Sequence, residues 1–142
     1  MDEVVIYLNK NHLKPNEVVY ILFEYCNRYI KPSYNNYKNF CGELNQCAIE
    51  LERRLGYEYT PILLDLALFV DECRLDLCND KIVFMKNSDI KVNGDLNYIL
   101  YKYCKTYNYS GFNILLRKAA KKITSEILGT YEFTKMMENG DI

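Results

Sequence analysis

The chain has 142 residues, of which 49% are hydrophobic and 26% are charged. This is the composition of a globular domain, and the length allows one hydrophobic core rather than two ordinary domains. The formal net charge of −1 argues against electrostatic attachment to nucleic acid or to an anionic membrane. No apolar run approaches the roughly 20 residues of a membrane span, and the acidic start Met1-Asp2-Glu3 is unlike an export signal. We therefore expect a single domain, residues 1–142, in the cytoplasm, with the nucleus as the alternative.

The residues that usually carry chemistry show no catalytic or metal-binding pattern. The six cysteines include no Cys-x-x-Cys pair, and the closest two are Cys73 and Cys78. The only histidine, His12, lies in a polar stretch before the first predicted helix, and the glycines form no phosphate-binding loop. We therefore expect reduced thiols that behave as small apolar residues, and we expect no metal, no cofactor and no enzymatic activity.

Apolar residues at three- and four-residue spacing predict two helices in the first half of the chain. The first runs from about Pro15 to Ile30 and begins with a proline in its first turn. The second runs from Tyr34 to Leu55 and carries the most regular apolar stripe in the sequence. Gly56 suits the left-handed cap that often ends a helix.

The middle of the chain gives one strong and one weak prediction. Residues 62–70 are apolar nearly all round, which is typical of a helix in the centre of a bundle, and Thr60-Pro61 suits its start. The pattern weakens after Cys73. Residues 82–92 could form a short β-hairpin instead of a helix and a loop.

Two further helices are expected in the second half. Asp95 is a plausible N-cap for a helix that follows it, and a final amphipathic helix begins after Ser110-Gly111. Gly129 is expected to end that helix, and a short helix through Tyr131, Phe133 and Met136 is expected within Thr130–Ile142 before the chain frays. The sequence thus predicts an all-α bundle of amphipathic helices around a central apolar helix.

The basic run Arg117-Lys118…Lys121-Lys122 has two readings. With the tyrosines upstream of it, the run resembles a small nucleic-acid patch. It also fits the solvated face of an amphipathic helix, where basic residues are favourable near the C-terminal half. We favour the second reading because the whole chain is slightly acidic, and we expect no nucleic-acid partner.

Three segments, in order, resemble the poxvirus Bcl-2-like immunomodulators. Residues Tyr20–Arg28 are similar to the first core helix of that family. Residues Gly42–Ile49, leading to Leu55-Gly56, resemble its second helix. Residues Leu96–Lys105, with Tyr107–Tyr109 after them, resemble its central helix and aromatic exit. The likeness spans roughly residues 16 to 128, although the family's frequent tryptophan at the aromatic exit is missing.

The resemblance implies a Bcl-2-like bundle that binds other proteins inside a host cell. Such proteins suppress innate immune signalling, toward NF-κB or interferon factors, by occupying host adaptors or kinases. Many relatives dimerise through their first and sixth helices, which implies a homodimer or partner face here. The residues that this face would use are Tyr20, Glu24, Arg28, Arg117 and Lys121.

An apoptosis inhibitor of the same fold is the alternative. It would bind amphipathic pro-death helices in a surface groove walled by Leu44, Ala48, Leu51 and Leu100. The Asn-Trp-Gly-Arg signature of cellular Bcl-2 proteins is absent, which weakens this reading. The same four side chains would equally well form a closed core.

Overall fold

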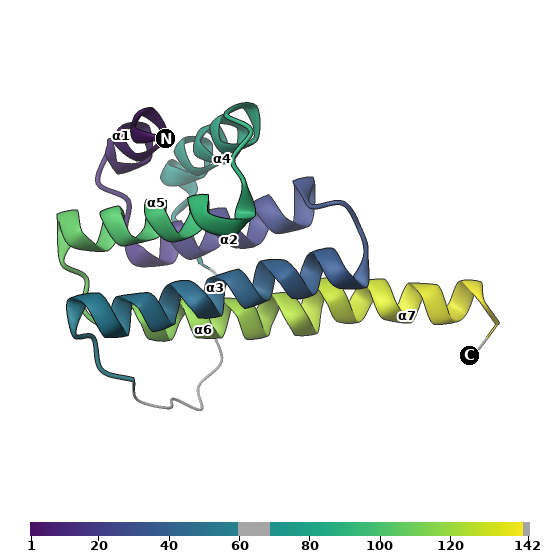
Figure 1. Ribbon diagram of the computed structural model, residues 1–142. Helices are drawn as coiled ribbons and strands as arrows, with labels where there is room; N and C mark the ends of the chain where they lie inside the picture. The colour runs from purple at the N-terminus through teal and green to yellow at the C-terminus, as the bar shows by residue number, and fades with distance from the viewer. Residues whose placement is uncertain (60–68, 141–142) are drawn as a thin grey trace.

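The chain is helical wherever regular structure occurs in residues 1–59 and 69–140, which are the residues that the computed structural model describes (Figure 1). This confirms the all-α class. The elements are α1 (Asp2–Asn9), α2 (Pro15–Tyr29), α3 (Tyr34–Leu55), α4 (Glu72–Asn87), α5 (Val92–Tyr107), α6 (Phe112–Ile123), the π-helical turn η1 (Thr124–Leu128) and α7 (Gly129–Glu138).

The longest helices form the body of the bundle. Helix α3 packs along α6 and against α5, and α2 packs against both α4 and α6. The short α1 lies against α4 and α5, on the side of the molecule away from α3 and α6 (Figure 1). Helix α6, the turn η1 and α7 continue in one direction, so that α7 extends beyond the end of the bundle (Figure 1).

Helix α3 confirms the clearest sequence prediction at both of its ends. The Ser33 hydroxyl accepts a hydrogen bond from the backbone N–H of Asn36 at 3.0 Å, which satisfies one of the free donors of the first turn. Gly56 ends the helix in the left-handed conformation with φ of 70°. The stripe between these ends is buried against α5 and α6; it consists of Tyr37, Cys41, Leu44, Ala48 and Leu51.

The predicted β-hairpin over residues 82–92 is wrong, because residues up to Asn87 belong to α4. The buried side chains of this helix are Cys78, Ile82 and Met85, at helical spacing, together with Lys81. Lys81 occupies a buried position and so interrupts the apolar stripe that would have indicated a helix. The β-branched pair Ile82-Val83 then gave the stronger local signal, which favoured a strand.

The start of α5 differs from the prediction. Asp95 does not precede the helix as its N-cap; its carboxylate accepts a hydrogen bond from the backbone N–H of Lys91 at 2.7 Å, one turn earlier. Gly94 lies between Lys91 and Asp95 and has a φ of 95°. Residues without a Cβ adopt such a positive φ most easily, which explains the glycine at this position. The N–H of Gly94 donates to a carboxylate oxygen of Glu43 on α3 at 3.1 Å, which fixes this kinked entry against the bundle.

The prediction that Gly129 ends the last helix is also wrong. Gly129 has helical dihedral angles, φ −59° and ψ −42°, and the chain continues as α7 to Glu138. Glycine favours a helix end only when the next residues leave the helix, and here Tyr131 still packs on Tyr37 of α3 with 5.8 Å between ring centroids.

The predicted central apolar helix, residues 62–70, falls almost wholly outside the described residues. Its last two residues, Phe69 and Val70, are described and are not helical. Phe69 is 69% exposed, whereas Val70 is buried in the core.

Candidate functional site

The four residues expected to wall a groove lie inside the bundle. Leu44, Ala48 and Leu51 on α3 and Leu100 on α5 are between 0 and 2% exposed. A bound helix could touch them only if α3 and α5 separated from their neighbours, since these side chains form part of one continuous core. They therefore offer no surface to a partner in this conformation.

Three residues of the expected dimer or partner face, Tyr20, Glu24 and Arg28, lie on α2, and Arg28 contacts α4. Glu24 and Arg28 form an ion pair at 2.9 Å, and Arg28 also donates to the side-chain oxygen of Asn79 on α4 at 3.0 Å. Tyr20 is half-buried, and burial raises the pKa of its phenol.

The other two residues of that face, Arg117 and Lys121, lie on α6, and Arg117 contacts α3. The Arg117 guanidinium on α6 pairs with the Glu52 carboxylate at 2.8 Å and holds the pKa of that carboxyl below its usual value. The same guanidinium lies 4.5 Å from the ring centroid of Tyr59, and Lys121 is exposed. Helices α2 and α6 pack on one another, but no hydrogen bond or ion pair in residues 1–59 and 69–140 joins Arg117 or Lys121 to Tyr20, Glu24 or Arg28.

The densest polar arrangement was not predicted, and it holds the N-terminal segment to α4 and α5. Four side chains donate hydrogen bonds to backbone carbonyls within residues 7–13. We call these four, Arg74, Lys81, Tyr103 and Tyr107, the N-terminal clasp. Lys81 donates to the carbonyls of Tyr7 and Lys10, Tyr107 to Asn9, Arg74 to Asn11 and His12, and Tyr103 to Leu13. Backbone carbonyls look alike whatever the side chain, so the sequence of residues 7–13 carried no signal for these bonds.

Lys81 is the most unusual member of the N-terminal clasp, because its side chain is fully buried. Its ammonium caps the C-terminal carbonyls of α1, where a positive charge is favourable, and lies 4.1 Å from the ring centroid of Tyr7. No carboxylate in the described part of the chain forms an ion pair with it. Burial therefore lowers the pKa of Lys81 to about 8.

Arg74 connects the N-terminal clasp to a buried ion pair. Its guanidinium forms two bonds to the carboxylate of Glu17, at 2.7 and 2.9 Å, and the Glu17 side chain is only 3% exposed. The backbone N–H of Lys14 donates to the same carboxylate at 2.8 Å. These bonds hold the pKa of the Glu17 carboxyl below its usual value and tie the start of α2 to the start of α4.

Aromatic rings close the remaining side of the N-terminal segment. His12 is exposed, as expected, but it is not isolated: a ring nitrogen lies 2.8 Å from the hydroxyl of Tyr109, and its ring packs on Tyr107 with 4.4 Å between centroids. Tyr103 packs on both tyrosines and on Phe112. These contacts hold the His12 ring against the tyrosines of α5 and of the loop that follows it.

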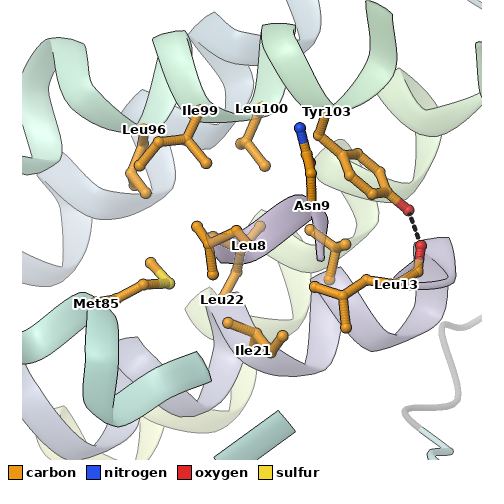
Figure 2. Close-up of a pocket in the computed structure, with 11 residues that line it drawn as sticks. Leu8, Asn9, Leu13, Ile21, Leu22, Met85, Leu96, Ile99, Leu100 and Tyr103 are labelled. Carbon is orange, nitrogen blue, oxygen red and sulfur yellow. Dashed lines mark hydrogen bonds between the residues drawn. The ribbon is translucent and has the colours of Figure 1, made fainter. Parts of the chain in front are cut away.

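Beneath α1 lies a small apolar cavity of about 20 Å³ (Figure 2). Leu8 of α1 points into it, and the facing walls come from Leu22 of α2, Met85 of α4 and Leu100 of α5 (Figure 2). The cavity has room for about one water molecule, and its lining offers few polar partners, so it reflects imperfect packing of α1 on the bundle.

The cysteines are dispersed in the core, and Cys73 alone is exposed. Burial raises the pKa of the Cys26, Cys47 and Cys104 thiols to about 12 and that of Cys78 to about 11. Thiols with such pKa values are poor nucleophiles at neutral pH. No group of three metal-binding side chains is found among residues 1–59 and 69–140.

An exposed apolar surface runs along α7, where the helix leaves the bundle. Phe133, Met136 and Met137 are 53, 45 and 57% exposed, and no residue of α7 is buried. Their spacing of three and four residues places them on one side of the helix. We call these three residues the C-terminal apolar stripe; the sequence predicted a short helix through Phe133 and Met136 but not that its apolar side would be exposed.

Comparisons with known protein families, curated proteins and solved structures find no match to this chain. None of the helices in the described residues is long and apolar enough to cross a membrane.

Proposed function

We propose that this chain is a protein-binding domain that acts through its surface, and that the C-terminal apolar stripe is its main contact. Three large apolar side chains, each about half exposed, lie together on a helix that extends past the bundle. Exposed apolar clusters of this kind mark protein interaction sites, and methionine adapts to irregular partner surfaces. This observation supports binding more strongly than any feature in the part of the chain that the structure describes supports catalysis.

The resemblance in sequence suggests who the partners are. On that basis the bundle is Bcl-2-like, the chain is viral, and it suppresses innate immune signalling by occupying host adaptors or kinases in the host cytoplasm. The all-helical fold is compatible with this family. The burial of Leu44, Ala48 and Leu100 supports a surface-binding immunomodulator over the alternative, an apoptosis inhibitor that takes pro-death helices into a groove.

A reporter assay tests the proposal. Cultured animal cells that carry NF-κB and interferon-promoter reporters would express the chain or its triple variant Phe133→Ser, Met136→Ser, Met137→Ser. We expect the unaltered chain to reduce at least one reporter signal and the triple variant to lose most of that effect. The variant should keep most of its thermal stability, because none of the three side chains is buried.

A matched control carries Ile6→Ser and Val83→Ser, which are exposed apolar residues on α1 and α4. It should suppress the reporters as the unaltered chain does. If the triple variant suppresses the reporters as strongly as the unaltered chain, the partner contact does not lie on α7. Micromolar binding of pro-death peptides in calorimetry would favour the apoptosis inhibitor instead.

A further inference from the structure

The positive charge of this chain is concentrated in one continuous stretch of sequence. Residues 96–125, which include most of α5 and all of α6, contain six lysines and arginines and no aspartate or glutamate. All 19 acidic residues of the chain lie outside this stretch. The net charge of −1 therefore conceals a local excess of positive charge, and an acidic partner responds to the charges within a Debye length of its contact rather than to the total.

Part of this positive charge lies beside tyrosines near the C-terminal ends of α3 and α5. The two helices pack side by side, and their C-terminal ends lie at the same end of the molecule (Figure 1). The Arg54 guanidinium on α3 lies 5.3 Å from the ring centroid of Tyr101 on α5, and the Lys105 ammonium lies 5.9 Å from the same centroid. One turn earlier, the Lys102 ammonium lies 5.5 Å from the ring centroid of Tyr98. We call these five residues the basic tyrosine surface.

The basic tyrosine surface is accessible and adjoins a hollow. All five of its side chains are half-buried or exposed. The Tyr98 ring is fixed at its far end, because its hydroxyl donates a hydrogen bond to the Asp2 carboxylate at 2.5 Å. A surface hollow of about 260 Å³ is lined by Arg54, Gly94, Asn97, Tyr98 and Tyr101. Among the residues that the structure describes, no carboxylate lines this hollow, so a side chain of a partner can enter it beside the guanidinium.

The carboxylates of the chain itself neutralise this surface only in part. Glu50 pairs with Arg54 at 3.1 Å, yet the Arg54 side chain remains 59% exposed. Lys102 and Lys105 form no ion pair within residues 1–59 and 69–140. Attraction to the helix dipole accounts for Lys105, which lies in the last turn of α5, but not for Lys102, which lies before that turn. The two ammonium groups therefore keep hydrogen-bond donors for an acid from outside the chain.

The contacts within the surface favour carboxylates over nucleic-acid bases. The three cations lie beside the tyrosine rings, where unpaired bases would otherwise stack. Affinity for nucleic acid also grows with the number of phosphate contacts, and two unpaired lysines supply few of them. A cation that rests on an aromatic ring is held in place and retains N–H donors for a carboxylate. Tyrosine and arginine together are typical of protein interfaces.

We propose that the basic tyrosine surface binds an acidic segment of a partner protein, rich in aspartate and glutamate. Carboxylates of that segment pair with Lys102, Lys105 and the exposed side of Arg54, and a neighbouring side chain occupies the hollow beside Tyr98 and Tyr101. The C-terminal ends of α3 and α5 lie at the end of the bundle away from α7 (Figure 1). This surface is therefore separate from the C-terminal apolar stripe, and both can be occupied at once.

Fluorescence anisotropy of a short labelled peptide, composed mainly of aspartate and glutamate, tests the proposal. We expect saturable binding to the unaltered chain, and the affinity should fall as the salt concentration rises. Lys102→Gln combined with Lys105→Gln should weaken binding roughly tenfold, because two ion pairs with the peptide are lost. Tyr101→Leu removes no charge but should weaken binding roughly threefold, because no ring then holds Arg54 and Lys105 in place.

A matched control separates this surface from the overall charge. Lys118→Gln combined with Lys121→Gln removes the same amount of charge from α6 and should leave the affinity for the peptide nearly unchanged. An equal loss in both double variants overturns the proposal, as does an unchanged affinity in Tyr101→Leu or the absence of saturable binding. Tighter binding of a labelled single-stranded oligonucleotide of equal charge overturns it in favour of nucleic acid. Circular dichroism and thermal unfolding verify that each variant remains folded.

Discussion

Replacing Arg74 by methionine tests the energetics of the N-terminal clasp most severely. Methionine fills much of the same space but leaves the Glu17 carboxylate, 3% exposed, without its two bonds from the guanidinium. Breaking a buried pair by removing one partner costs roughly 3–5 kcal/mol. The Arg74 side chain is 28% exposed and Lys14 still donates to Glu17, so we expect the lower end, about 3 kcal/mol.

Chemical denaturation and thermal unfolding at pH 7 measure this loss. About 3 kcal/mol corresponds to a decrease of roughly 10 °C in Tm for a domain of this size. The double variant Glu17→Gln, Arg74→Met should recover part of the loss, because it no longer leaves a buried charge unpaired. Arg53→Met is the matched control: that side chain is 68% exposed, and removing its ion pair should cost less than about 0.5 kcal/mol.

The pH dependence follows from the direction of the pKa shift. The Glu17 carboxyl has a lowered pKa in the folded chain, so its stabilising contribution is present above the unfolded pKa near 4.5. This contribution disappears as the pH falls through the lower folded value, and the difference between the unaltered chain and Arg74→Met should shrink below pH 4.5. A constant difference down to acidic pH, or a loss no larger than in Arg53→Met, would refute the reasoning.

Three further predictions concern single groups. Ser33→Ala removes the N-cap of α3 and should cost about 1 kcal/mol in denaturation, whereas Ser33→Asp should restore most of it. Leu44→Ala, at a fully buried position, should cost roughly 2–5 kcal/mol, and a loss below about 1 kcal/mol would show that this part of the core is open. Lys81 has a folded pKa of about 8, below the usual 10.5, so the unfolded chain binds more protons between these values. The free energy of unfolding of the unaltered chain, relative to Lys81→Met, should therefore rise from pH 8 to pH 10; a fall over that range contradicts the assignment.

The sequence predicted the elements whose signals are local. Helix α3 was found at its full length, because its long apolar stripe is regular and is followed by Gly56, which suits a left-handed cap. Helix α2 was predicted within a residue of its end, since Pro15 marks its first turn. Regular spacing with a residue that marks one helix end was enough in both cases.

Elements that depend on distant contacts escaped prediction. In α4, Lys81 occupies a core position because the carbonyls of Tyr7 and Lys10, some 70 residues earlier, receive its ammonium. Helix α1 buries only Val4 and Leu8, which is too few residues for a periodic signal. At Gly129 the continuation into α7 depends on packing with α3 rather than on local preference.

The candidate site was predicted least well. The spacing of Leu44, Ala48 and Leu51 correctly identified one face of α3, but periodicity cannot distinguish a groove from a core. The residues expected on a partner face are spread over α2 and α6 and engage different neighbours. The C-terminal apolar stripe depends on where α7 leaves the bundle, which only the tertiary structure shows.

We propose above that the chain binds host signalling proteins through α7. Quantitative mass spectrometry of proteins that copurify with it from animal cells tests this most directly, with the unaltered chain beside the Phe133, Met136 and Met137 triple serine variant. We predict that an adaptor or kinase of the NF-κB or interferon pathways is retained by the unaltered chain and by the Ile6, Val83 control, and is lost from the triple variant. Retention of the same proteins by all three forms would contradict the account.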